Sequence, residues 1–130
     1  GPRGTPAYAA IIGIHNIQPI GSKNGDDSVQ RALNQLKSSL GTAVKNLRIL
    51  NDSSWTYIRD GRRLPGRQIT VSYMHKDEQF FKHLIAIPRP RGTITHVWSY
   101  TAPKREFIEF QPVAKQILSS WRILNATETK

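Results

Sequence analysis

Three consecutive segments with the composition of β-strands, joined by short turns, constrain the fold of this chain more than any other feature of its sequence. The segments are Gln68 to His75, Phe80 to Ile87 and Thr93 to Thr101. The first alternates hydrophobic and polar residues, a pattern typical of a strand with one buried face. Turn residues separate the segments at Lys76 to Glu78 and, in the sequence PRPRG, at Pro88 to Gly92. We therefore expect a consecutive antiparallel meander.

Two amphipathic segments are expected to pack on this meander as helices. The first follows the sequence GSKNGDD and has hydrophobic residues at spacings of four, three and four, which places them on one helix face. Its apolar stripe consists of Val29, Leu33, Leu36 and Leu40. The candidates for its N-cap are Asp26, Asp27 and Ser28, and Gly41 is expected to end it.

The second helical segment lies near the end of the chain and contains a proline. Its apolar stripe consists of Phe107, Phe110, Ala114, Ile117, Leu118 and Trp121. Pro112 would break a helix in its interior, so we expect a short first turn and a second start near Gln111. We interpret the stripe as the surface that packs on the sheet, with Trp121 in the core. An aromatic ligand site is the alternative.

The remaining segments predict further strands and one loop. Tyr8 to Ile17 is a short apolar run with β-branched residues, as expected for a buried strand. Asn46 to Ile58 indicates two short strands with a turn at Asn51 to Ser54, and Arg59 to Arg67 is interpreted as a Gly-, Pro- and Arg-rich loop. Together these elements predict a single α+β domain in which helices flank an antiparallel sheet.

The length of 130 residues suits one domain with one core. We expect a flexible or tag-derived N-terminus over residues 1–7, the domain over 8–124 and a tail over 125–130. No apolar run approaches the roughly 20 residues that span a bilayer. The sequence contains no cysteine, which excludes disulfides, thiolate metal sites and a cysteine nucleophile.

Four stretches resemble the PsbP/Mog-like superfamily, which includes the DcrB-related bacterial proteins. They are DSVQRALNQLKSSLG, GRQITVSY, ITHVWSYTAP and FIEFQPVAKQILSSWRI, within a region from Ala9 to Leu124. In that superfamily a late strand leads through a small-residue and proline turn into a last helix. In relatives this helix ends with a serine and an aromatic residue, and a hydrophobic strand comes next. Ser119 to Ile123 occupy the corresponding position here. Members usually open with an extra hairpin that bears a proline and a tryptophan, and this sequence lacks it.

The resemblance implies an α/β/α arrangement and a non-enzymatic role. Relatives assist photosystem assembly, engage a small GTPase, act as secretion chaperones or are envelope lipoproteins. We accordingly expect no catalytic residues and no cofactor. An exported or periplasmic location, with the signal peptide or lipid anchor removed, is favoured. We expect a monomer or weak dimer.

Arginines are concentrated in two segments that strand direction would bring together. Two chain reversals in the meander place the predicted loop Arg59 to Arg67 and the turn Pro88 to Gly92 at the same end of the sheet. Arginine forms bidentate contacts with carboxylate or phosphate that lysine cannot form. The predicted anion-binding pole consists of Arg59, Arg62, Arg63, Arg67, Arg89 and Arg91.

A net charge of +10 indicates an anionic partner, although it also serves solubility alone. The favoured function is a non-catalytic protein-binding or assembly module that meets an acidic protein surface. A basic nucleic-acid-binding domain is the alternative, since exposed aromatic rings could stack on bases. The candidate rings are Trp55, Tyr57, Tyr73 and Trp98. No recognised nucleic-acid-binding motif accompanies them.

Two histidines are weak candidates for a metal site. Counting about the PRPRG turn places His83 beside His96 on neighbouring strands, on the face that holds Ile85, Ile94 and Trp98. Zinc or copper would need a third ligand, and no carboxylate is placed to supply one. We therefore expect no metal site. The carboxylates are explained by helix caps and turns, no pair suits acid–base chemistry, and DGRRLPGR lacks the spacing of a phosphate-binding loop.

Overall fold

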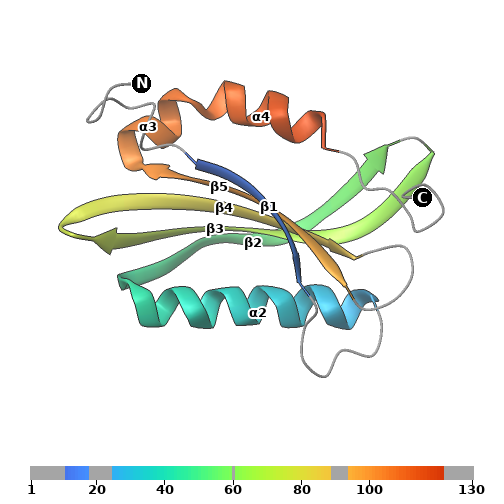
Figure 1. Ribbon diagram of the computed structural model, residues 1–130, viewed down its shortest axis with the longest axis horizontal. Helices are drawn as coiled ribbons and strands as arrows, with labels where there is room; N and C mark the ends of the chain where they lie inside the picture. The colour runs from blue at the N-terminus through green and yellow to red at the C-terminus, as the bar shows by residue number, and fades with distance from the viewer. Residues whose placement is uncertain (1–10, 18–24, 60, 89–93, 122–130) are drawn as a thin grey trace.

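A five-stranded antiparallel sheet with strand order β1-β5-β4-β3-β2 forms the centre of the computed structural model (Figure 1). Residues 11–17, 25–59, 61–88 and 94–121 are described. The strands are β1 (Ile11–Ile17), β2 (Lys45–Arg59), β3 (Arg62–His75), β4 (Glu78–Pro88) and β5 (Thr95–Pro103). The helices are α2 (Gly25–Ala43), α3 (Lys104–Glu109) and α4 (Gln111–Ser119). The chain is thus a single domain with an antiparallel sheet and a few helices.

The predicted meander is confirmed, because β3, β4 and β5 pair with one another in sequence order. The β3–β4 turn is tight, with His75 opposite Glu78 and positive φ angles of 51° at Lys76 and 65° at Asp77. Two successive residues with positive φ match the right-handed twist of the flanking strands. Tyr73 and Phe80 face each other behind this turn and stack with a centroid distance of 5.7 Å.

The two faces of the sheet carry separate hydrophobic clusters, and Figure 1 shows helices on both faces. α2 covers one face, where Val29 and Leu33 pack against the sheet. The strand residues of this cluster are Ile69, Val71, Tyr73, Leu84, Ala86 and Val97. α3 and α4 lie on the other face. Its buried residues are Tyr57, Ile85, Ile87, Trp98, Tyr100, Ala102, Phe107, Ala114 and Trp121.

The helix with the leucine stripe continues past the residue that was expected to end it. Gly41 lies inside α2, and a Cβ atom at this position would be 3.7 Å from the nearest Leu47 atom, an ordinary contact. Asn46, two residues beyond Val44, adopts a left-handed conformation with φ 56° instead. Asparagine tolerates that conformation better than most residues. The N-cap candidates were also misplaced, because α2 begins at Gly25, before all three of them.

β1 is an edge strand, which corrects the expectation of a buried strand. Among the described strands it pairs with β5 alone, and Ile11 and Ile14 are 62% and 57% exposed. An apolar run does not distinguish a central strand from an edge strand, because neither length nor composition reports the number of neighbours. Ile12 does pack against the core on the α4 face. The predicted segment from Tyr8 to Ala10 lies outside the described residues.

A single long strand replaces the two short strands expected from Asn46 to Ile58. The predicted turn, Asn51 to Ser54, is part of β2 and pairs with β3 from Thr70 to Arg67. The nearest irregularity is a register shift between Ile49 and Asn51, just before this segment. Polar residues with a turn preference are accepted here because β2 is the other edge of the sheet and faces solvent.

The predicted loop Arg59 to Arg67 is also wrong, since it forms a tight hairpin between β2 and β3. Arg59 pairs with Arg62, and Gly61 has a φ of 78°. Pro65 is accommodated within β3 because it pairs with Thr56 of β2 on one side only, and the pairing of β3 with β4 begins at Arg67. The preference of Gly and Pro for turns was outweighed by strand pairing.

The helical end of the chain is divided as predicted. α3 ends at Glu109, Phe110 lies between the helices, and Pro112 occupies the first turn of α4. Trp121 is 6% exposed and contacts Trp55 and Tyr57 at centroid distances of 6.5 and 6.4 Å. The core interpretation of the stripe is therefore confirmed at Trp121.

Candidate binding surface at the β2–β3 hairpin

The end of the β2–β3 hairpin extends beyond the rest of the sheet. Pairing between these strands continues from Trp55 opposite Gly66 to Arg59 opposite Arg62, whereas the pairing of β3 with β4 stops at Arg67. We call the described residues 55–59 and 61–66 the hairpin arm. Figure 1 shows it as the part of the sheet that projects past the end of α4. One face of the arm packs on Trp121 through Trp55 and Tyr57, whereas Ile58 and Arg63 on the other face are exposed.

Arg59 of the hairpin arm is engaged by α4. Its Nε donates to the carbonyl oxygen of Ser119 at 3.2 Å, and its Nη2 donates to that of Leu118 at 3.4 Å. The guanidinium also lies over the Tyr57 ring, 5.4 Å from the centroid. The last carbonyls of a helix lack partners within the helix and carry partial negative charge, so a cation is favoured there. Arg59 therefore holds the end of α4.

Arg67 is paired with Asp52 at the base of the arm. Its Nη2 and Nε donate to one carboxylate oxygen at 2.6 and 3.2 Å. The two side chains are 38% and 36% exposed, and an ion pair of that exposure adds little to stability. It does neutralise the charge of Arg67 locally. Of the predicted arginine pole, Arg59 and Arg67 thus make contacts within the chain.

Arg62 and Arg63 lie near the end of the arm, on opposite faces of the ribbon. Arg62 pairs with Arg59, and Arg63 is an exposed residue opposite Ile58, which is itself 55% exposed. Arg89 and Arg91 lie outside the described residues. Pro88, the last residue of β4, and Thr95, the first residue of β5, pair with each other on either side of this segment. Their pair lies at the same end of the sheet as the hairpin arm, as strand direction predicted.

The expected proximity of the two histidines is wrong. His83 pairs with Tyr100, and His96 pairs with Ile87, so the register differs from the predicted one by four residues (100 − 96). The segment between β4 and β5 is longer than the turn that was counted, because β5 begins at Thr95. An even shift keeps both side chains on the α4 face but separates them along the strands.

His83 is instead part of a hydrogen-bonded row that crosses three strands. Gln68 donates from Nε2 to Ser53 Oγ at 3.3 Å, so its Oε1 accepts from His83 Nε2 at 3.0 Å. Asn51 Nδ2 extends the row to Ser53 Oγ at 3.4 Å. Burial lowers the pKa of His83, and the positive charge of Lys115 on α4 lowers it further. Sequence reasoning missed this row, since only the β2–β3 register brings its members together.

His96 has a different polar partner, on β1. Its Nδ1 is 2.6 Å from Asn16 Oδ1, and because the amide oxygen accepts, the ring nitrogen donates. Within the described parts of the chain, no group of three His, Cys, Asp or Glu side chains is arranged to bind a metal ion. Asp52 forms an ion pair with Arg67, and Asp77 and Glu78 lie at the β3–β4 turn.

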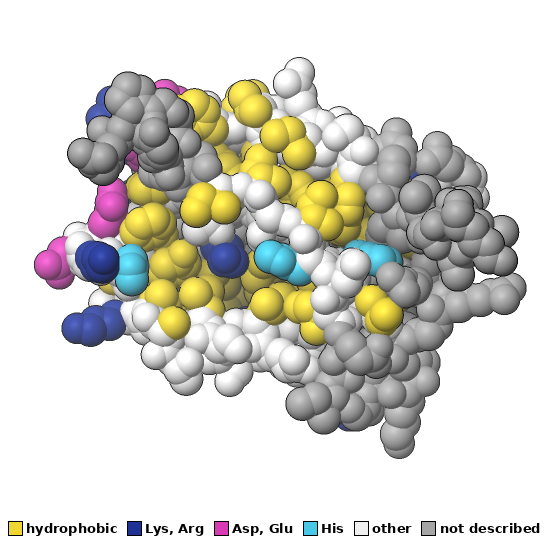
Figure 2. Space-filling model, in the orientation of Figure 1, with side chains coloured by type: hydrophobic (Ala, Val, Ile, Leu, Met, Phe, Trp, Pro, Cys, Tyr) yellow, Lys and Arg dark blue, Asp and Glu magenta, His cyan; other side chains and the backbone are white. Residues whose placement is uncertain are grey.

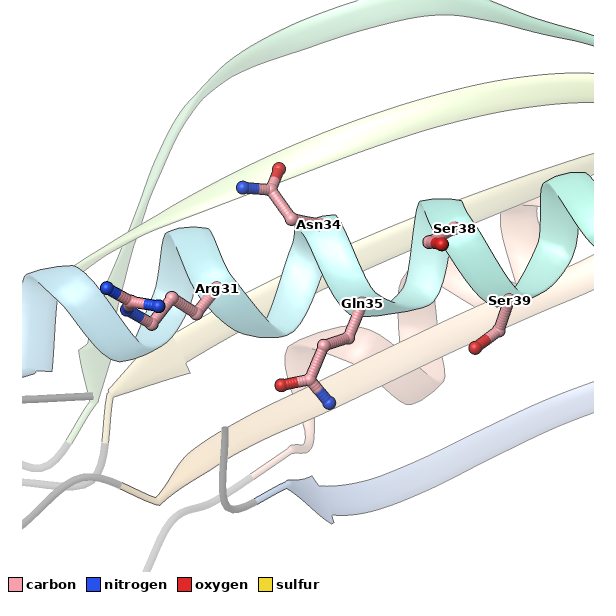
Figure 3. Close-up of a pocket in the computed structure, with 5 residues that line it drawn as sticks. All are labelled: Arg31, Asn34, Gln35, Ser38 and Ser39. Carbon is pink, nitrogen blue, oxygen red and sulfur yellow. The ribbon is translucent and has the colours of Figure 1, made fainter. Parts of the chain in front are cut away.

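The hollows of the surface offer little to a small ligand. Among the described residues one hollow is lined by α2, and Figure 3 shows its side chains spread along several turns of that helix. Its members are Arg31, Asn34, Gln35, Ser38 and Ser39. A second lies near the β3–β4 turn, between Arg48, Met74 and Phe81. Neither combines convergent polar groups with an enclosed apolar wall, as ligand sites do.

The aromatic rings considered for base stacking are mostly inaccessible. Tyr57 and Trp98 are 1% exposed and Tyr73 is 7% exposed, while Trp55 stacks on Trp121. None of the described helices has the length and apolar character needed to cross a membrane.

Comparison with known proteins supports the fold alone. A crystal structure from Pseudomonas aeruginosa, described as a protein of unknown function, PA94, and putative regulator, is similar to this chain with a TM-score of 0.55 and 11% sequence identity. The similarity covers 89% of this chain and 85% of that one. No protein-family model and no curated protein matches the sequence. The class defined by these observations is a single-domain protein with an antiparallel five-stranded sheet and helices.

Proposed function

We propose that this chain is a non-catalytic protein-binding or assembly module whose hairpin arm contacts an acidic protein surface. The observation that carries the proposal is the position of Arg62 and Arg63, in the part of the β2–β3 ribbon that pairs with no other described strand. Exposed Ile58 lies opposite Arg63, so the arm offers an apolar contact beside a cation. Protein interfaces commonly combine an apolar centre with arginine.

Electrostatics favours an acidic partner for the whole molecule. The net charge of +10 attracts a negative surface before contact and raises the association rate, an effect that salt weakens. At the arm, the guanidinium of arginine can then bind a carboxylate in a bidentate manner. The proposal gives this role to Arg62 and Arg63 because they lie at the end of the arm, beyond the point where the pairing of β3 with β4 stops.

The proposal includes an α/β/α arrangement of the PsbP/Mog-like type. The separate clusters that α2 and the pair α3–α4 form on opposite faces support that arrangement. The resemblance in sequence to that superfamily supports the absence of a catalytic role. Nucleic acid is the less favoured partner, because the buried rings of Tyr57, Tyr73 and Trp98 provide no stacking platform.

Fluorescence anisotropy with defined probes tests this function. The probes are a labelled peptide that alternates glutamate and leucine, a single-stranded DNA and a duplex DNA. We compare the wild type with the double variant Arg62→Glu/Arg63→Glu. Lys104→Glu/Arg105→Glu is the matched control, because it makes the same charge change at two exposed neighbours beyond β5, at the opposite end of the sheet.

The arm variant is expected to weaken peptide binding by more than about tenfold and to flatten its salt dependence. The control is expected to weaken it only as far as the loss of net charge requires. Equal losses in the two variants would show that net charge alone drives binding, and tighter binding of either DNA than of the peptide would refute an acidic protein partner.

A further inference from the structure

The outer edge of β1 lacks the features that normally prevent a strand from pairing with another chain. Among the described residues, β1 pairs only with β5. Its seven residues, IIGIHNI, include no lysine, arginine, aspartate, glutamate or proline. The register with β5 advances one residue at a time from Ile11 to Ile17, without a bulge. A flat, uncharged edge strand presents unpaired backbone groups that can hydrogen-bond to another strand.

The opposite edge of the sheet is protected. β2 carries charged residues along its length, namely Lys45, Arg48, Asp52 and Arg59. Its register with β3 is interrupted between Lys45 and Arg48 and again between Ile49 and Asn51. Charges and bulges are the devices by which natural proteins prevent edge pairing. The two edges of this sheet therefore differ, and only β1 suits pairing with a further strand.

We propose that a second copy of this chain pairs antiparallel with β1, with a two-fold axis that passes through Ile14 perpendicular to the sheet. In this register all seven residues of β1 have a partner, and Ile14 faces its own copy. Ile11 then faces Ile17 of the second copy. Both exposed isoleucines of the strand are thus placed opposite an isoleucine.

Neighbouring registers lack this match. The faces of the two sheets stay aligned only if the axis moves by whole residues. An axis at Gly13 places Ile11 opposite His15, and an axis at His15 leaves Ile11 beyond the end of the overlap. The sequence of β1 is therefore complementary to itself in one register, which is what a two-fold interface requires.

Charge also favours β1 as the contact. Two copies that each carry a net charge of +10 repel each other, so an interface between them is favoured where charged residues are absent. Figure 2 views the molecule from the side of β1, and hydrophobic side chains gather on this face, with His and Lys or Arg side chains among them. α4 adds exposed Val113 and Ile117 on the face of the sheet to which Ile14 belongs.

The proposed assembly is closed. Each copy uses its single unprotected edge, and the β2 edges at the two outer ends resist further addition. The result is a dimer with one continuous sheet of twice five strands rather than a fibre.

Disulfide trapping tests the register, because the chain contains no cysteine. At Ile14 the two Cα atoms would lie about 4.5–5.5 Å apart, within the range of a disulfide. At Ile11 the two copies of the same position would be about 20 Å apart, six residues along the strand. Ile14→Cys is expected to form a covalent dimer under mild oxidation, and Ile11→Cys is not. Equal crosslinking of the two variants, or none in Ile14→Cys, would overturn the register.

Sedimentation velocity tests the association itself. The wild type is expected to show a monomer–dimer equilibrium, and Ile14→Lys should raise its dissociation constant by more than about tenfold, because two ammonium groups would meet at the axis. Ile49→Lys is the matched control, since Ile49 is 49% exposed on the β2 edge, and it should leave the equilibrium unchanged. A wild type that stays monomeric up to its solubility limit, or an equal effect of the control, would refute the proposal.

Discussion

The guanidinium of Arg59 donates a hydrogen bond to the carbonyl oxygen of Ser119, a residue 60 positions later in the chain. This contact joins the β2–β3 hairpin to the C-terminal end of α4. Trp121 follows two residues after Ser119, and its ring lies against Trp55 and Tyr57 of β2, the strand that ends at Arg59. An edge strand, a helix end and the aromatic part of the core are therefore coupled through one arginine.

Replacing Arg59 with alanine should lower the free energy of unfolding by about 1–2 kcal/mol, because two hydrogen bonds to helix carbonyls and the contact with Tyr57 are lost. Arg63→Ala is the matched control. Arg63 is exposed four positions away, so its removal should change stability by less than about 0.5 kcal/mol. Urea denaturation measures both values. Equal stability of the two variants would show that Arg59 does not hold α4.

The parts of the fold that follow from local pattern could be predicted from the sequence. The β3–β4–β5 meander follows from alternation and short turns, and the division between α3 and α4 follows from Pro112. β2 could not be predicted, because the polar residues at Asn51 to Ser54 favour turns as strongly as they tolerate an exposed strand edge. Pairing with β3 along its whole length decided between the two.

The candidate site shows a similar division. Strand direction correctly placed the ends of the arginine segments at one end of the sheet, but it could not show which arginines already have partners. Arg67 faces Asp52 only because β2 is one continuous strand, and Arg59 reaches Ser119 only because α4 ends above it. The β4–β5 register depends on the length of the connection between the two strands, which composition does not define. The predicted pairing of His83 with His96 was therefore wrong.

The burial of Trp121 predicts a large loss of stability on truncation. Trp121→Ala should lower the free energy of unfolding by about 3–5 kcal/mol, since the ring leaves a cavity between α4 and β2. Ile117→Ala is the comparison on the same helix. Ile117 is 40% exposed and should lose no more than about 1 kcal/mol. A denaturation midpoint that Trp121→Ala leaves unchanged would contradict the core assignment.

Two glycines should respond to the same substitution with opposite sign. Gly41 lies inside α2 with room for a methyl group, so Gly41→Ala should stabilise the protein by about 0.5–1 kcal/mol. At Gly66 a Cβ atom would overlap the carbonyl oxygen of Ala86 and the Ile87 side chain, where β3 passes the end of β4. Gly66→Ala should therefore destabilise it by about 1–3 kcal/mol. Thermal unfolding measures both effects, and a loss of stability in Gly41→Ala would contradict the position of α2.

The buried His83 should make stability depend on pH. Its pKa is lowered from the ordinary value of 6.5, first by burial and then by the charge of Lys115. Below about pH 6.5 the unfolded chain therefore binds a proton at His83 more readily than the folded chain does. The free energy of unfolding should fall as the pH falls through this range, whereas above it both states are neutral at His83 and the histidine adds no dependence.

His83→Gln removes the titrating ring but keeps a side-chain donor for Gln68 Oε1. The variant should lose less stability than the wild type between about pH 8 and about pH 5, as measured by urea denaturation across the range. His75→Gln is the control, because His75 is an exposed residue beside the β3–β4 turn and this change leaves His83 in place. The acid-induced loss should persist in His75→Gln. If His83→Gln loses as much stability as the wild type on acidification, groups other than His83 cause the dependence.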